Sequence, residues 1–402
     1  MASNRPAFWH INSILTFVLL FLLYFIFLKS KGDSVFQIDR RIVTHFDFLI
    51  PILILPIIIF SYFLISEANA TLASKQLVYF TVATFVFCLF FLTPLRKIEW
   101  LIPLFFWIAI ALLISVEFFG ISRLGAKRWL EIPFVHFTIQ PSEILKPAFI
   151  LMLAYLIKQD PPPQKGYGWK QFFKLSFYIL LPFVLIAKEP DLGTAMILLM
   201  LGYGILFIIG VDKKIWITLG ILIALASPFL YNHLHDYQKK RITDFLSDTP
   251  SYHVKQSIIA IGSGGLYGKE KDEATQTHYK FLPIATSDFI FAYTVERFGF
   301  WGAFALIVCY ALLIIHLITL NYQLKKEPFA QVMTSGIALL IFLYMGVNIA
   351  MTIGLAPVVG VPLPLFSYGG SSFITFFALF GILENLLAFR FDPTYRSIKY
   401  SL

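Results

Sequence analysis

The sequence is poor in charged residues and in cysteine, and both shortages limit the class of protein it can form. Only 14% of its 402 residues are charged, whereas 58% are hydrophobic and the mean hydropathy is +0.77. Soluble domains carry about 25% charged residues, so this composition excludes an ordinary water-facing surface. The two cysteines, Cys88 and Cys309, lie in apolar runs, which favours a packing role over a disulfide framework or a zinc site.

Internal repeats and low-complexity segments are also missing, which favours a single integral domain. What the chain has instead is a series of apolar runs, each near the roughly 20 residues that a membrane-spanning helix needs. They lie at 11–28, 46–65, 77–94, 101–120, 142–157, 175–187, 191–211, 215–232, 297–320, 332–353 and 370–388. The sequence therefore predicts an all-α polytopic membrane protein.

The distribution of Lys and Arg predicts the orientation of these helices, because basic residues are enriched in cytoplasmic loops. If the run at 46–65 crosses outward, the short outer loops contain only Lys75, Arg123, Lys127, Arg128 and Lys188. The inner loops contain the larger set, Arg40, Arg41, Arg96, Lys97, Lys158, Lys165, Lys170, Lys174, Lys213, Lys214, Lys325, Lys326, Arg390, Arg396 and Lys399. The C-terminus is then cytoplasmic and the stretch 233–287 lies outside. The net charge of +9 reflects this loop bias, and no nucleic-acid partner is expected.

The first apolar run, 11–28, is followed by Lys29 and Lys31, so its N-terminus is expected to face outward. A cleaved signal peptide is the alternative, but no small-residue cleavage site follows the run. We therefore expect an extra N-terminal transmembrane helix with a cytoplasmic linker over 1–45. An integral membrane domain follows over 46–390, and a short cytoplasmic tail over 391–402.

The predicted outer loop at 121–147 gathers polar residues. Lys127 and Arg128 stand beside Trp129, whose ring suits the membrane interface. These two cations either bind an anionic substrate or anchor the loop to lipid headgroups. Glu143 and Lys146 have i, i+3 spacing, which predicts an ion pair on one helix face, with a structural or a substrate-binding role.

Two further polar clusters lie on the predicted outer side. In EPDLGT (189–194), Asp191 is placed to cap the next helix, a role that does not explain Glu189. Lys239, Lys240 and Arg241 are adjacent in the chain. Three cations near a membrane surface attract phosphate, although a solvated face is the commoner role of such a cluster.

The strongest single candidate is Asp288, where a polar stretch gives way to an apolar run. A carboxylate at the mouth of a membrane segment is costly to desolvate, which makes it a functional candidate, with helix capping as the alternative. The uncharged loop GLAPVVGVPLPLFSYGGSS (354–372) contains three prolines and two hydroxyl-rich turns, which include Ser367 and Ser371. Such a loop can form a rigid wall that positions a long ligand.

Together these stretches resemble the SEDS family (shape, elongation, division, sporulation), most closely its rod-shape branch. The resemblance rests on GAKRW (125–129), QPSEILKP (140–147), EPDLGT (189–194), YQKKR (237–241), QSIIAIGSGGLYGK (256–269), SDFIFA (287–292), ERFGFWG (296–302) and PLPLFSYGGSS (362–372). These motifs span about 121–390 in the family's order. The resemblance implies a ten-helix bundle, here with one extra N-terminal helix and a large outer loop between the helices at about 215–232 and 297–320.

The resemblance also implies a function. Members of this family are peptidoglycan glycosyltransferases that polymerise lipid II at the outer face of the bacterial cytoplasmic membrane, and the rod-shape branch serves cell elongation and rod-shape maintenance. The aspartate that matches Asp288 is the family's essential catalytic residue. Substrate binding is expected to involve Lys127, Arg128, Trp129, Glu143, Lys146, Glu189, Asp191, Lys239, Lys240, Arg241, Ser367 and Ser371.

The implied partners are lipid II, undecaprenyl-pyrophosphate-linked glycan, a class B penicillin-binding protein (a transpeptidase) and other elongation-complex proteins. A divalent cation, Mg²⁺ or Mn²⁺, is a candidate cofactor, and no organic cofactor is expected. Three alternative functions are a lipid II flippase or transporter, a non-catalytic scaffold, and the cell-division polymerase. Transporters place ionisable residues near the bilayer midplane, whereas most of these acids and cations lie at predicted outer helix ends.

The sequence departs from the family's pattern on both sides of Asp288. The usual Pro-Glu, polar residue, His, Thr run is here Pro-Ile-Ala-Thr-Ser at 283–287. The usual paired glutamates after the aspartate are here Glu296 and Arg297. No role that depends on the missing Glu and His is carried over to this chain.

Overall fold

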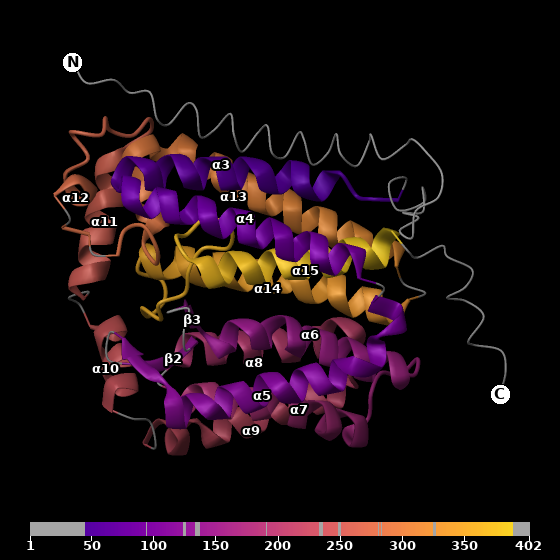
Figure 1. The fold of residues 1–402 in the computed structure, drawn as a ribbon. Coiled ribbons are helices and arrows are strands. Elements are labelled where there is room, and N and C mark those ends of the chain that lie inside the picture. Colours follow the sequence, from indigo (N-terminus) through magenta and orange to yellow (C-terminus); the bar gives the residue numbers. More distant parts are fainter. Residues whose placement is uncertain are drawn as a thin grey trace, which may run out of the picture.

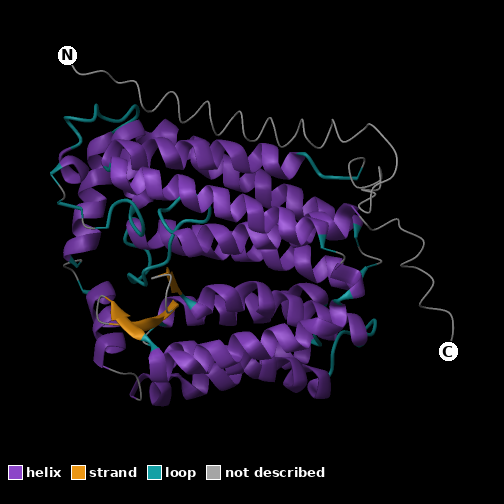
Figure 2. Cartoon of the chain, in the orientation of Figure 1, coloured by secondary structure: helices purple, strands orange, loops and turns teal. Residues whose placement is uncertain are grey.

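The computed structural model describes residues 45–93, 95–123, 126–132, 137–189, 191–232, 236–247, 251–279, 281–282, 284–324 and 327–388. Long helices make up most of it (Figures 1 and 2). The ten apolar runs predicted from residue 46 onward are all helical, as α3 (Leu49–Ala68), α4 (Ala70–Leu92), α5 (Ile102–Phe119), α6 (Pro141–Gln159), α7 (Trp169–Lys188), α8 (Leu192–Ile209), α9 (Lys213–Asn232), α13 (Ile290–Gln323), α14 (Pro328–Thr352) and α15 (Gly370–Ala388). The predicted extra helix at 11–28 lies outside the described residues.

The helices lie side by side as a bundle in which α14 occupies a central position (Figure 1). Helix α14 packs against α6 and α8 on one side and against α13 and α15 on the other. Gly336 makes this close approach possible, because an added Cβ would lie 2.8 Å from Ile150. By length and composition, eight of the described helices could cross a membrane, and α6 and α9 are not among these eight. The all-α polytopic fold predicted from the sequence is therefore confirmed.

Polar or conformationally restricted residues set several helix ends. Helix α4 begins at Ala70, earlier than predicted, because the Asn69 side chain accepts hydrogen bonds from the amides of Thr71 and Leu72. Proline occupies the first position of α6 and of α14, where its missing N–H has no helical partner to lose. Helix α13 begins at Ile290, ahead of the predicted 297, so the charged pair Glu296–Arg297 lies inside it.

Short elements gather at one end of the bundle (Figure 1). They are a three-stranded antiparallel sheet of β1 (Ile121–Arg123), β2 (Ala126–Ile132) and β3 (Phe137–Ile139), and the helices α10 (Asp236–Leu246), α11 (Tyr252–Gly264) and α12 (Thr275–His278). Two 3₁₀ turns, η1 (Leu95–Lys97) and η2 (Glu99–Leu101), precede α5. The sequence predicted only a loop over 121–139, so the sheet is a feature that it did not reveal.

Helix α13 is kinked at Gly299, whose φ of +63° and ψ of −160° are not helical. The kink frees backbone amides, and the turn that follows α11 accepts their hydrogen bonds. The amide of Phe300 donates to the carbonyl of Gly265 at 2.9 Å, and that of Trp301 donates to Leu266 at 3.3 Å. Backbone groups freed inside an apolar bundle need such partners, so the kink and the turn stabilise each other.

Close packing of α11 on α13 predicts that Gly264→Ala destabilises the protein. An added Cβ would overlap the carbonyl oxygen of Val295, so the two helices would have to separate. We expect a loss of about 1–3 kcal/mol, measured as a lower thermal midpoint in detergent. Gly262→Ala is the matched control, because a Cβ added at this position of the same helix would have nothing within 4 Å. A midpoint as high in Gly264→Ala as in the control would contradict the packing argument.

Candidate functional site

Asp288 lies in a turn at the end of the bundle that holds α10 to α12, two residues before α13 begins. Its side chain is half-buried. The Asn348 side chain, fully buried in α14, donates to the carbonyl of Asp288 at 2.8 Å and to that of Val361 at 2.7 Å. One amide group thus fixes the Asp288 turn and the 354–369 loop at the same point.

The 354–369 loop is fastened to the Asp288 turn at a second place. The Ser367 hydroxyl donates to the carbonyl of Ser287 at 2.6 Å and accepts from the amide of Leu363 at 2.7 Å. The amide of Tyr368 donates to Thr286 at 2.8 Å. In this structure Ser367 therefore positions the loop, while Ser371 lies half-buried at the start of α15.

The Asp288 carboxylate faces a part of this loop that has no side chain. A Cβ built on Gly360, which has a φ of +67°, would lie 3.5 Å from Oδ2 of Asp288. Glycine is suited to this position both because φ is positive and because a side chain would lie against the carboxylate. The glycine therefore allows the loop backbone to lie close to the acid.

Arg128 and Asp191 lie near Asp288 and form the charged part of the site. A nitrogen of the Arg128 guanidinium lies 3.5 Å from Oδ2 of Asp191, and Arg128 Nε donates to the carbonyl of Glu189 at 3.3 Å. Asp191 is buried and caps α8 as predicted, accepting from the Thr194 amide at 3.2 Å. One arginine from β2 thereby connects the sheet to the start of α8.

The environment shifts the pKa of two carboxyls at this end. Burial raises the pKa of Asp288, and the Asp191 charge raises it further, while a hydrogen bond with Ser287 and the Arg128 charge oppose the shift. Burial and the Asp191 charge raise the pKa of Glu189 to about 8, against the opposing effect of Arg128. Glu189 is therefore largely protonated at neutral pH, which explains how it can lie buried beside another acid.

Glu143 and Lys146 form the predicted ion pair in the first turns of α6. Lys146 Nζ lies 2.5 Å from Oε1 of Glu143 and 4.6 Å from the centre of the Tyr344 ring, and the lysine is fully buried. The backbone carbonyl of Glu143 accepts from Thr375 at 3.1 Å, and Oε2 of Glu143 has no hydrogen-bond partner among the described residues. A buried pair of this kind joins α6 to α14 and α15.

Lys127, Lys239 and Arg241, the remaining predicted cations whose side chains the structure describes, have their contacts away from Asp288. Lys127 donates to the carbonyl of Glu117 at 2.6 Å, and Lys239 donates to that of Asn232 at 3.0 Å. Trp129 pairs with Ile121 in the register of β1 and β2. Arg241 lines a separate pocket between α10, α11 and the 354–369 loop. The side chain of Lys240 lies outside the described part of the structure.

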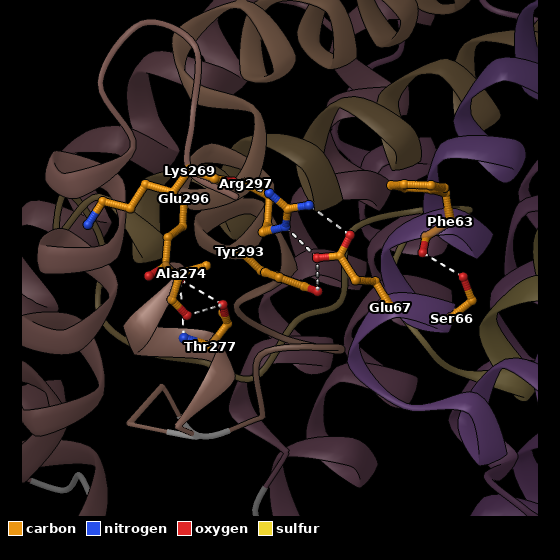
Figure 3. Close-up of polar contacts among 9 residues, drawn as sticks. All are labelled: Phe63, Ser66, Glu67, Lys269, Ala274, Thr277, Tyr293, Glu296 and Arg297. Atoms are coloured by element: carbon orange, nitrogen blue, oxygen red, sulfur yellow. Dashed lines mark hydrogen bonds and ion pairs between the residues drawn. The ribbon is translucent and has the colours of Figure 1, made fainter. Parts of the chain in front are cut away.

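A second polar cluster fixes the N-terminal part of α13 (Figure 3). Arg297 makes a two-point ion pair with Glu67 at the end of α3, with one contact at 2.9 Å, and also donates to the carbonyl of Lys269. Glu296 is fully buried and accepts from the amides of Gln276 and Thr277 at 2.9 and 3.1 Å. These adjacent charged residues therefore bind two different segments to α13.

Sequence reasoning identified Arg128, Asp191 and Asp288, which the fold brings together, but it missed Asn348 and Glu67. The signal for Asn348 was an amide inside the apolar run of α14, where a polar group needs an internal partner. Glu67 could not be paired with Arg297 from the sequence, because the residues are 230 positions apart.

The site and fold first define a class: a polytopic α-helical membrane protein with a buried carboxylate and arginine cluster at one end of its bundle. The family model of the FtsW/RodA/SpoVE cell cycle proteins matches residues 14–391. The chain therefore belongs to the FtsW/RodA/SpoVE family.

Two curated relatives illustrate the match. The peptidoglycan glycosyltransferase MrdB of Helicobacter pylori (strain ATCC 700392 / 26695) is 57% identical over 360 residues, which cover 90% of this chain and 94% of the relative. MrdB of Escherichia coli (strain K12) is 40% identical over 73% of this chain and 79% of the relative.

Solved structures agree on the fold. A chain of a peptidoglycan synthase complex, described as coordinating polymerization and crosslinking, has a TM-score of 0.75 at 22% identity and covers 86% of this chain and 99% of its own. The rod shape determining protein RodA of Thermus thermophilus has a TM-score of 0.64 at 22% identity, covering 86% of this chain and 98% of its own.

The Glu67–Arg297 pair predicts that Arg297→Gln destabilises the protein. Both side chains are largely buried, at 13% exposure for Arg297 and 10% for Glu67, so the substitution leaves an unpaired carboxylate in a poorly solvated place. We expect a loss of about 3–5 kcal/mol in unfolding free energy, and partial recovery in Glu67→Gln/Arg297→Gln. The control is Lys158→Gln, whose 40%-exposed lysine pairs with Glu99 and should contribute about 1 kcal/mol or less. Equal losses in Arg297→Gln and in the control would show that the pair is not important for stability.

The raised pKa of Glu189 predicts a pH-dependent stability. The native state holds the Glu189 proton more tightly than the unfolded chain does, so this contribution is fully present below the ordinary pKa of 4.5 and is lost as pH rises through about 8. Glu189→Gln keeps the shape and removes the titration. The thermal midpoint of wild type, compared with that of Glu189→Gln at the same pH, should therefore be lowest at alkaline pH. A difference in thermal midpoint between the two proteins that is constant from pH 4.5 to about 8 would contradict the raised pKa of Glu189.

Proposed function

We propose that this protein is a peptidoglycan glycosyltransferase that polymerises lipid II at the outer face of the bacterial cytoplasmic membrane. The observation that carries the proposal is the half-buried Asp288 carboxylate beside Arg128 and Asp191, at the end of an apolar bundle. Family membership and the names of the MrdB relatives support the activity. The rod-shape and elongation role is proposed from the resemblance to the family's rod-shape branch, and a structural neighbour is named a rod shape determining protein.

In the proposed reaction, the 4-hydroxyl of an acceptor lipid II attacks C1 of the donor sugar. The new C–O bond forms as the bond from C1 to the lipid pyrophosphate breaks, which inverts the configuration at C1. Asp288 accepts the proton of the attacking hydroxyl, and the pyrophosphate leaves with the electron pair. A positioned general base of this kind contributes roughly 10²–10⁴-fold to the rate.

The surroundings of Asp288 suit this role. Its pKa is raised by burial, and a base is more effective when its pKa is closer to the working pH. The loop that faces the carboxylate has glycine at position 360, so no loop side chain covers the carboxylate at this point. Arg128 is close enough to interact electrostatically with Asp288, and a guanidinium is well suited to bind the departing pyrophosphate.

A divalent cation is compatible with these residues. The described part of the chain contains no cluster of three or more His, Cys, Asp or Glu that could hold a metal ion. If Asp288 held such a cation, it would do so instead of acting as the base, with Asp191 as the neighbouring carboxylate, since Mg²⁺ often binds through one or two carboxylates together with substrate phosphates. Bound there, Mg²⁺ or Mn²⁺ would neutralise charge on the leaving pyrophosphate.

The proposed orientation places the C-terminus in the cytoplasm and Asp288 outside, following the Lys and Arg distribution. A class B penicillin-binding protein is the proposed partner, because the structural neighbour with a TM-score of 0.75 comes from a peptidoglycan synthase complex. Such a partner would crosslink the strands that this protein makes.

The test of the proposed function is polymerisation of labelled lipid II by purified protein in detergent. Wild type should produce glycan strands, and Asp288→Asn should lose nearly all activity while its thermal midpoint stays close to that of wild type. Asp272→Asn is the matched control, because Asp272 is an exposed carboxylate on the same outer segment.

Robust synthesis by folded Asp288→Asn protein would place the base at another residue. Movement of intact lipid II between vesicle leaflets without glycan formation would favour the flippase instead. Absence of both glycan formation and lipid II movement would favour the scaffold.

A further inference from the structure

A pocket of about 240 Å³ lies between α10, α11 and the 354–369 loop, apart from the Asp288 carboxylate. Its lining includes Arg241, Asp244 and Phe245 from α10, Ser251 at the start of α11, and Pro357 and Val358 from the loop. The proposed reaction uses none of these side chains except Arg241, which was predicted to bind pyrophosphate. The pocket is therefore a candidate binding site distinct from the Asp288 carboxylate.

The lining is mostly apolar, with Val254, Ile258 and Ile353 among its members, and it carries a few polar side chains. Arg241, Asp244 and Phe245 have i, i+3 and i+4 spacing and share one face of α10. The arginine and aspartate charges cancel, so the pocket does not favour an anion as a purely basic cluster would. Both groups, with the hydroxyl of Ser251, form hydrogen bonds to hydroxyls, while Phe245 and Val358 offer an apolar surface. A pyranose ring has this combination of hydroxyl edges and apolar C–H faces.

The pocket is connected to the proposed catalytic carboxylate through a short piece of chain. Val358 packs against a cluster that includes Phe289, next to Asp288, and the carbonyl of Val361 shares its amide donor with Asp288. From Val358 to Val361 the chain spans at most about 11 Å, since a residue extends no more than about 3.6 Å. A glycan of a few sugar rings reaches from the pocket to Asp288.

We propose that this pocket is a saccharide-binding subsite that holds a sugar unit of the glycan strand while Asp288 acts on the next coupling. This inference rests on the proposed function and adds a binding site for its product, the glycan strand. A strand held in the pocket stays bound between additions, so the subsite increases the number of sugars added before release. The pocket thereby sets strand length without taking part in bond formation.

The test compares Ser251→Phe, which fills the pocket, with wild type. The Ser251 side chain makes no capping hydrogen bond to α11, so its replacement removes no helix cap. The rate of the first coupling between two lipid II molecules should stay within about twofold, while the mean strand length falls several-fold. Ile259→Phe places the same phenyl ring at an exposed position of α11 outside the pocket lining and should leave strand length unchanged.

Binding of a lipid-free glycan oligosaccharide, measured by calorimetry in detergent, provides a readout that does not need activity. Ser251→Phe should weaken this binding at least tenfold, and so should Asp244→Asn, which keeps the shape of the pocket if Ser251→Phe fails to fold. Unchanged strand length and unchanged affinity in a folded variant would overturn the subsite. Absence of any glycan product from wild type would instead overturn the proposed function, and the binding measurement would still decide whether the pocket takes a saccharide.

Discussion

The site depends on one constraint, which is that non-helical backbone inside an apolar bundle must find its hydrogen bonds within the protein. Both segments around Asp288 are irregular, and the amide of Asn348 satisfies a carbonyl of each. The Ser367 hydroxyl satisfies a carbonyl and an amide of the same two segments. These contacts fix the position of the carboxylate, so the polar residues of α14 and of the loop support the site without belonging to its chemistry.

Charge at this end is arranged so that few ionised groups are left without a partner. Arg128 balances Asp191, and the raised pKa of Glu189 removes a second negative charge at neutral pH. Asp288 interacts with Arg128 electrostatically, without a direct ion pair to any of the described residues. A carboxylate in this state is poorly solvated and available to a proton donor, which is the condition the proposed base requires.

The sequence predicted the helices well, because long apolar runs have few other stable arrangements in a membrane. It also identified Asp191, Arg128 and Asp288, whose polarity contrasts with their surroundings. It did not predict the small sheet at 121–139, where short strands depend on pairing with one another. The Glu67–Arg297 pair and the pocket beside Arg241 were also not predicted. Both join segments distant in the chain, and a single sequence does not record such contacts.

The kink at Gly299 has a consequence for how motion at this end can be observed. The amides of Phe300 and Trp301 belong to a membrane helix, yet they donate to carbonyls of the turn that follows α11. The exchange of these two amides with solvent deuterium therefore depends on whether the turn stays hydrogen-bonded to them, and not on fraying of α13. Two amides inside a helix thus record the opening of the turn that follows α11, on the timescale of local unfolding.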